Sequence, residues 1–394
     1  MSFLMARQAV QTCVLSRRWV HLWCTMPCLH IDQRELDDTA CHLIDRETHE
    51  TGRFVDFVHG LFMFYMAPSL DTFKLHISHG YSCRIIDRWV RRGIKYSPEV
   101  LEICCADHDI DQAYELPHLG SEIYYAYYHD IDPAYELPHL GSNSCRLKRM
   151  SLSGLRLHKS FTLHLRSGCP VLEDLEVERC HIAYPEIISY TLKNLTIQDC
   201  RTYCGNALTV TAPALVSFRL AFLAMELRGI LVTEMPAVVK ASICLKPDPY
   251  GLTSREGSFK LLGSLINVTS LELSGRETLS ILRHGWNNFP TFPNLKTLML
   301  SGCDLSHNFQ ILAPSLERLT LQHCKVADGS SKRKRSGHPK TMSLKCQKNI
   351  LTFECPDLKW TEIKYREGEI QPLFDLLSGI WRNLQESRIV LAKA

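Results

Sequence analysis

The chain has 394 residues, of which 45% are hydrophobic and 22% charged, and its formal net charge is +3. A charge so near balance argues against a surface adapted as a whole to nucleic acid or to an anionic membrane. No apolar run approaches the roughly 18 residues that a membrane-spanning helix needs, and the first residues lack the long apolar segment of a signal peptide. We therefore expect an intracellular protein, cytoplasmic, nuclear or both.

The first 25 residues predict two short helices. Residues 6–13 are good helix formers, and Ser16 can cap a second helix with an apolar face. The residues of that face are Leu15, Trp19, Leu22 and Trp23. Two tryptophans are more than so small a helical pair can hide. They either pack on the domain that follows or form a docking surface for a partner.

Further helices and strands then alternate. The apolar stretch 53–66 predicts a core helix, and 85–94 predicts another. Leu70, Phe73 and Leu75 alternate as a strand does, and a second strand is predicted at 100–104. An alternation of helices and strands fits an α/β repeat fold.

Residues 108–121 and 129–142 are a tandem duplication that differs only at Gln112 and Pro133. Neither copy contains the apolar phrase found in the rest of the chain. We expect one copy to loop out of the array or to add a short strand at its surface. The alternative is a binding loop, because acidic and aromatic residues on surface loops often carry function.

From Leu147 onwards an apolar phrase recurs, and its clearest copy is L-x-x-L-x-L-x-x-C at 295–303. The copies are spaced 20 to 30 residues apart. Their first residues are Leu147, Leu172, Leu192, Leu215, Val238, Val268, Leu295 and Leu316. The phrase resembles the leucine-rich repeat, in which each unit forms one strand and must stack on its neighbours to bury its apolar side. The resemblance implies an α/β fold, a horseshoe-shaped solenoid of leucine-rich repeats.

Strand alternation predicts which residues of each phrase point away from the core. On a repeat array these residues form the binding surface. The candidate target contacts are Glu176, Glu178, Thr196, Gln198, Met299, Thr320 and Gln322. They are chemically mixed and specify no class of target.

The 17 cysteines are an odd number, and many close a repeat phrase. We interpret them as small buried apolar residues of a reducing compartment. Cys24 and Cys28 lie four residues apart, but no second pair with zinc-ligand spacing follows. We therefore predict no metal and no cofactor. The sequence also lacks the motifs of hydrolases, metalloproteases and nucleotide-binding enzymes, so we predict no catalytic residues.

Two features mark the C-terminal part. Lys332–Arg335 is a basic cluster in a polar stretch, and it favours a disordered loop or a nuclear localisation signal. Residues 368–384 predict an amphipathic helix, followed by a closing strand at 389–391. A terminal repeat needs such a cap to cover its core.

The run Leu15-Ser-Arg-Arg-Trp19 resembles the second half of a plant F-box, and the C-terminal part resembles the FBD segment of plant F-box/leucine-rich-repeat proteins. The family's opening Leu-Pro-x-x-Leu phrase would precede Ala6, where only Met1–Met5 stand. Either the sequence starts late or the F-box is truncated, and the resemblance covers only the second half of the motif. The implied layout is a partial F-box at 1–30, a helical transition at 31–68, repeats at 69–346 and an FBD-like cap at 347–394. Within the repeats lie the duplicated insert 108–142 and a disordered basic loop at 328–342.

This resemblance implies a non-catalytic substrate receptor of a Skp-cullin-F-box ubiquitin ligase. Leu15, Trp19, Leu22 and Trp23 would then hold the Skp-type adaptor, and the repeats would bind a target protein. The alternative is a leucine-rich-repeat interaction scaffold that no longer binds the adaptor, which the truncation favours. Neither interpretation involves nucleic acid or membrane.

Overall fold

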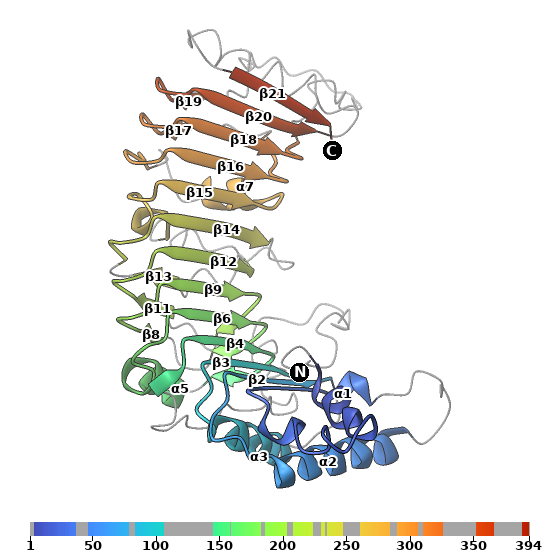
Figure 1. Ribbon diagram of the computed structural model, residues 1–394. Coiled ribbons are helices and arrows are strands. Elements are labelled where there is room, and N and C mark those ends of the chain that lie inside the picture. Colours follow the sequence, from blue (N-terminus) through green and yellow to red (C-terminus); the bar gives the residue numbers. More distant parts are fainter. Residues whose placement is uncertain are drawn as a thin grey trace, which may run out of the picture. The chain divides into compact units, whose positions relative to one another are not determined.

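Parallel β-strands that follow one another in chain order dominate the computed structural model (Figure 1). The structure describes residues 4–36, 46–78, 83–105, 145–157, 159–182, 186–202, 208–223, 230–232, 235–246, 261–283, 290–305, 310–325, 352–365 and 388–393. The chain divides into two units, Met1–Cys204 and Gly205–Ala394. Each has the mixed α/β character that the sequence predicts, with a parallel sheet and few helices.

The first unit contains a parallel sheet whose strands pair in chain order. Its strands are β1 (Cys28–Asp32), β2 (Thr72–Ile77), β3 (Val100–Cys105), β4 (Arg149–Ser153), β6 (Asp174–Glu178) and β9 (Asn194–Gln198). Equivalent residues of successive repeats face each other across the sheet, so each repeat adds one strand in a fixed register.

The second unit repeats this arrangement. Its strands are β12 (Ser217–Leu223), β14 (Lys240–Lys246), β15 (Ser270–Ser274), β16 (Thr297–Ser301), β18 (Arg318–Gln322), β20 (Trp360–Tyr365) and β21 (Arg388–Lys393). The strand β21 confirms the closing strand predicted from 389–391.

The core is built by the apolar positions of the repeated phrase. In β16, Leu298 and Leu300 are buried, whereas Met299 between them is half-buried. The first residue of every predicted phrase is buried as well. A single strand cannot cover these side chains, so stacking of successive strands supplies the apolar contacts.

A tight turn ends several of the strands, and the sequence analysis did not anticipate its conformation. The residue after the strand is left-handed at Gly154, Arg179, Asp199, Gly302 and His323, with φ between 49° and 70°. At three of these turns the chain continues into a short strand, and these strands pair in parallel: β5 (Arg156–Leu157), β7 (His181–Ile182) and β10 (Arg201–Thr202). Further short strands are β8 (Glu186–Ile188), β11 (Leu208–Thr211), β13 (Ile230–Val232), β17 (Gln310–Leu312) and β19 (Thr352–Glu354).

Two helices of the first unit confirm the sequence prediction. They are α2 (Arg46–Phe64) and α3 (Cys83–Ile94), which lie together beside β2 and β3 in Figure 1. Phe54 of α2 meets Trp89 of α3 edge-to-face, with ring centroids 5.5 Å apart, and both side chains are buried. The remaining helical segments are shorter: α1 (Ala6–Gln11), α5 (Lys159–Leu163), α7 (Thr278–Arg283), the 3-10 turns Thr12–Val14, Trp23–Thr25 and Gln33–Glu35, and a π-helical turn at His164–Gly168. None of the helices in the described part of the chain has the length and apolar character needed to cross a membrane.

The structure corrects one expectation at the N-terminus and adds one strand. The helix predicted after Ser16 is absent, and turns closed by hydrogen bonds such as Trp19 N to Ser16 O (2.9 Å) take its place. The strand β1, which the sequence analysis missed, follows directly and pairs with β2. The duplicated segments, the basic cluster and the helix predicted at 368–384 lie outside the described residues.

Candidate functional site

The outward face of the first sheet carries the polar residues that alternate with the core. The outward face of the first sheet means the side chains of β1, β2, β3, β4, β6 and β9 that point away from the buried positions. The strand register arranges them in two rows. The first row is His30, Lys74, Glu102, Ser151, Glu176 and Thr196, and the second is Asp32, His76, Cys104, Ser153, Glu178 and Gln198.

Four predicted target contacts lie together on this face. Glu176 opposes Thr196 across the pair β6–β9, and Glu178 opposes Gln198. Glu176 is exposed, and the other three are half-buried. Their outward orientation agrees with the strand alternation in the sequence, and the register of the repeats brings them together.

Hydrogen bonds already engage the two glutamates. The Ser151 hydroxyl lies 3.3 Å from Glu176 Oε2. The Arg179 guanidinium approaches Glu178 Oε1 at 3.4 Å and the Ser153 hydroxyl at 3.3 Å. These contacts orient the carboxylates on a half-exposed surface, where they remain accessible to a partner.

The three predicted contacts in the second unit lie on its corresponding face. Met299 opposes Thr320, and Gln322 opposes Ser301. Met299 and Gln322 are half-buried, but Thr320 is only 8% exposed. Thr320 therefore offers a partner little surface, although its register is the predicted one.

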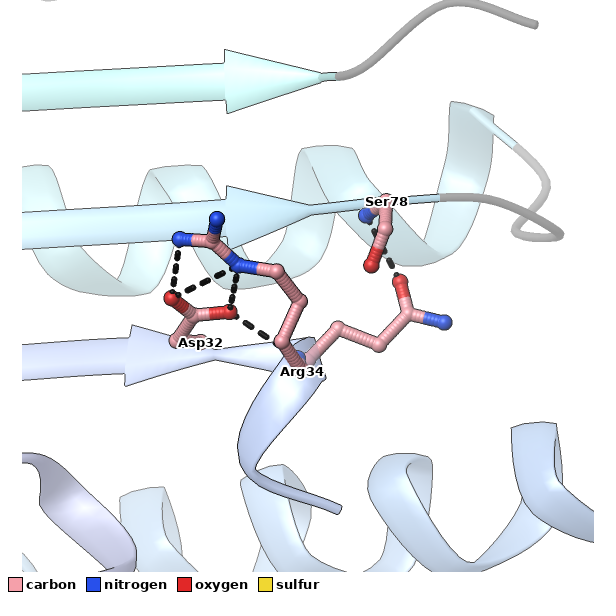
Figure 2. Close-up of polar contacts among 4 residues, drawn as sticks. Asp32, Arg34 and Ser78 are labelled. Carbon is pink, nitrogen blue, oxygen red and sulfur yellow. Dashed lines mark hydrogen bonds and ion pairs between the residues drawn. The ribbon is translucent and has the colours of Figure 1, made fainter. Parts of the chain in front are cut away.

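A buried carboxylate stands at the end of β1, where the sequence analysis had placed no site. Figure 2 shows the Asp32 carboxylate facing the Arg34 guanidinium, with Nη2 at 2.6 Å from Oδ2 and Nε at 3.0 Å from Oδ1. The Arg34 backbone N–H also donates to Oδ1, at 2.9 Å. Burial alone raises the pKa of Asp32, but the hydrogen bonds and charge of Arg34 outweigh it and hold that pKa below the usual value.

The neighbouring Gln33 ties β1 to β2. Its side-chain Oε1 accepts a hydrogen bond of 2.8 Å from the backbone N–H of Ser78, just after β2 ends (Figure 2). Gln33 is almost fully buried. The ends of the two strands are therefore fixed relative to each other beside Asp32.

Two imidazoles lie beside this carboxylate. The nearest ligand atoms of His30, Asp32 and His76 are all within 4.8 Å of one another. Burial, and next the charge of Lys74, lower the pKa of His30, which favours the neutral form of its imidazole. Lys74 itself is paired with Glu102. The His-x-Asp spacing at 30–32 was the available sequence signal, but it has meaning only on a strand, and β1 was not predicted.

The N-terminal segment exposes most of the apolar residues that were predicted to hold an adaptor. Leu15 is 69% exposed, Leu22 48% and Trp19 38%. Trp23 is buried, and it anchors the segment instead of presenting a contact surface. The structure adds Val14 to the exposed residues, at 87%.

The segment is fastened to the first unit by its polar and small residues. Ala6 and Ala9 of α1 are fully buried, and the Arg7 guanidinium donates to the backbone carbonyl of Glu35. The Tyr65 hydroxyl, at the end of α2, donates to the carbonyl of Met26. Exposed apolar side chains are thus displayed on a backbone that is held at both ends.

Together these features define a repeat protein with a polar sheet face and an exposed apolar segment near its N-terminus. The chain is 31% identical to the meiotic F-box protein MOF of rice (Oryza sativa subsp. japonica), over 98% of this chain and 82% of that protein. It therefore belongs to the family of plant F-box proteins. No protein-family model and no solved structure matches it.

Relatives in Arabidopsis thaliana have related names. A putative FBD-associated F-box protein is 27% identical, over 83% of this chain and 74% of the relative. A putative F-box/LRR-repeat protein is 23% identical, over 81% of this chain and 66% of the relative. These names agree with the F-box, leucine-rich-repeat and FBD resemblances found in the sequence.

Proposed function

We propose that this protein is a substrate-receptor subunit of a Skp-cullin-F-box ubiquitin ligase. Membership in the F-box family supports this role. The observation that carries the proposal is the exposure of Leu15, Trp19 and Leu22 in the segment that resembles an F-box. The chain performs no chemical step in this role, because other subunits transfer ubiquitin.

The exposed apolar side chains support adaptor binding on energetic grounds. Large apolar residues exposed close together on a protein surface are typical of interaction sites. Burial of Trp19 and Leu22 in an interface would recover free energy that the isolated protein does not gain. Trp23 serves the same surface indirectly, because its burial anchors the turns that carry the exposed residues.

Target binding is assigned to the outward faces of the two sheets. Parallel strands in chain order support a solenoid of leucine-rich repeats, and solenoids of this kind bind partners over extended surfaces. Glu176 and Glu178 give the first unit's face two oriented carboxylates. The receptor would hold a target near the ligase and so raise the effective concentration of the target's lysines.

Binding of a Skp-type adaptor to the full chain tests the first half of the proposal. Trp19→Ala and Leu15→Ala should each weaken binding in a pull-down or a titration. Leu163→Ala is the matched control, because Leu163 is 53% exposed but lies outside the segment. Full binding by both segment variants, or no binding by the wild-type chain, would leave the interaction scaffold as the function.

The second half is tested on the outward face. Glu176→Lys together with Glu178→Lys should abolish ubiquitination of the bound target in cells while adaptor binding persists. Asp357→Lys is a control, since Asp357 is exposed and lies just before β20 in the second unit, outside the first sheet's strands. Unchanged target ubiquitination in the double variant would remove the outward face of the first sheet from the proposal.

A further inference from the structure

We propose that His30, Asp32 and His76 form a binding site for a divalent transition-metal ion, with zinc as the first candidate. The site lies on the outward face of the first sheet, at the ends of β1 and β2. It can be tested separately from the proposed ligase role, because none of its residues belongs to the exposed N-terminal segment or is one of the predicted target contacts.

The sheet geometry brings the three ligands together. His30 and Asp32 are two residues apart on β1, so their side chains project from the same face. Asp32 is the register partner of His76 on β2, in a sheet whose strands lie about 4.8 Å apart. Two residues on one strand and one on its neighbour therefore converge above the sheet, with their ligand atoms within 4.8 Å of one another.

Side-chain rotation can bring the ligand atoms from these separations to the distances that a zinc ion requires. Zinc–ligand distances of about 2.0–2.1 Å in a tetrahedral site place donor atoms roughly 3.4 Å apart. Both imidazoles are half-buried, so neither ring is locked in a packed core. The backbone beneath them is fixed by the hydrogen bond between Gln33 and Ser78. Gln33 directly follows Asp32, and Ser78 lies two residues after His76.

The ligand chemistry suits a borderline metal ion. Two imidazoles and one carboxylate are a common ligand set for zinc and related ions, and they leave a position open for water or a further ligand. A ligating carboxylate normally has a hydrogen-bond partner outside the metal, and the Arg34 backbone N–H fills that role at 2.9 Å.

A metal ion at this site would compete with the Arg34 guanidinium for the Asp32 carboxylate. Its guanidinium covers both oxygens of Asp32, but 65% of its side chain is exposed, so it can swing into solvent without loss of packing. The nearby ammonium of Lys74 is already neutralised by Glu102. Metal binding should therefore displace the Arg34 guanidinium while its backbone contact persists.

Cobalt(II) titration of the full chain, after treatment with a chelator, tests the site. Cobalt bound by imidazole and carboxylate shows visible d–d absorption without the strong near-ultraviolet band that thiolate ligands give. This distinction separates the proposed site from binding by the 17 cysteines. We expect the d–d signal to saturate at one ion per chain and to disappear when zinc is added.

Variants assign the signal to these residues. His76→Ala and His30→Ala should each lower the affinity by at least about a hundredfold, because loss of a direct ligand costs more than the roughly 10–100-fold that loss of an outer-shell partner costs. His21→Ala is the matched control, because His21 is exposed and lies outside the cluster. Arg34→Ala should raise the affinity roughly fivefold, the effect of removing a partly exposed ion pair.

Misfolding cannot raise the affinity for cobalt. The higher affinity expected of Arg34→Ala therefore distinguishes the proposed site from an effect of misfolding. Cobalt bound only with a thiolate band would overturn the proposal. An affinity unchanged by His76→Ala, or lowered by Arg34→Ala, would overturn it as well.

Discussion

The thiol of Cys303 donates a hydrogen bond of 3.3 Å to the backbone carbonyl of Leu273, which belongs to the preceding strand of the sheet. The same bond recurs between equivalent residues of other repeats. The pairs are Cys180 with Leu152, Cys200 with Val177 and Cys324 with Leu300. The closing cysteine of the phrase therefore does more than fill space. It links each repeat to the one before it, which makes cysteine a specific choice at this position.

Cys303→Ala should destabilise the protein by about 1–2 kcal/mol, through loss of this bond and a small cavity in the core. Cys303 is fully buried, so water cannot replace the lost contact. Urea unfolding followed by circular dichroism measures the effect. Cys145→Ala is the matched control, because Cys145 is exposed and its removal should change the free energy of unfolding by less than about 0.5 kcal/mol.

Alkaline pH should weaken the fold through the same cysteines. The hydrogen bond with Cys324 and then burial raise the pKa of Cys303 above the usual thiol value of 9.0, and burial followed by the bond with Cys180 raises that of Cys200. A folded-state pKa above the unfolded value contributes stability that is complete below the unfolded pKa and is lost as pH rises above it.

The free energy of unfolding should therefore be insensitive to these thiols below pH about 9 and should fall above it. Urea titrations across pH 7 to 10.5, a range chosen on the basis of ordinary thiol pKa values, measure this dependence. The double variant Cys200→Ala, Cys303→Ala should show a shallower alkaline decline. An equally steep decline in that variant would show that other groups cause it.

The left-handed residue that follows several of the strands should prefer glycine. Gly302 and His323 occupy the same place in successive repeats, with φ of 64° and 51°. Glycine adopts this conformation freely, whereas other residues are strained by about 1–2 kcal/mol. Gly302→Ala should therefore destabilise the protein by about 1 kcal/mol, although no atom lies within 4 Å of the new methyl group.

The reverse change offers an internal control. His323→Gly should stabilise the protein by roughly 0.5–1 kcal/mol, after allowance for the greater freedom of glycine in the unfolded chain. Thermal unfolding of both variants measures the two shifts. Shifts of the same sign would contradict an explanation based on backbone conformation.

Gly93 of α3 packs against the ring of Phe73. A Cβ at this position would overlap the ring, and Phe73 is fully buried and has no room to move away. Gly93→Ala should therefore cost about 1–3 kcal/mol, although alanine is the better helix former. Gly60→Ala in α2 is the matched control. It has no atom within 4 Å of the added methyl and should gain up to about 1 kcal/mol on thermal or chemical unfolding.

Periodicity accounts for the parts of the fold that the sequence predicted well. Leu298 and Leu300 alternate with outward residues because every strand has a period of two, and Glu176 and Thr196 meet because the repeats keep a constant register. The helices α2 and α3 were also predicted, since their apolar residues recur with helical spacing. Such patterns are local or regularly repeated, so they can be recognised without knowledge of the tertiary structure.

Residues whose environment depends on distant partners were not predicted. Trp23 was assigned to a binding face, but it is buried, whereas Leu15 and Trp19 are exposed as expected. Thr320 has the predicted register but little exposure. Burial depends on which segments cover a side chain, and spacing within one segment does not contain that information.

The sequence by itself determined the repeated strand, its buried positions and the family resemblance, because each is encoded within about 25 residues and repeated along the chain. Only the tertiary structure decided which N-terminal side chains are exposed and that β1 joins the sheet beside β2. The convergence of His30, Asp32 and His76 was decided in the same way. Asp32 and His76 are 44 residues apart in the numbering and meet only because parallel pairing sets them side by side.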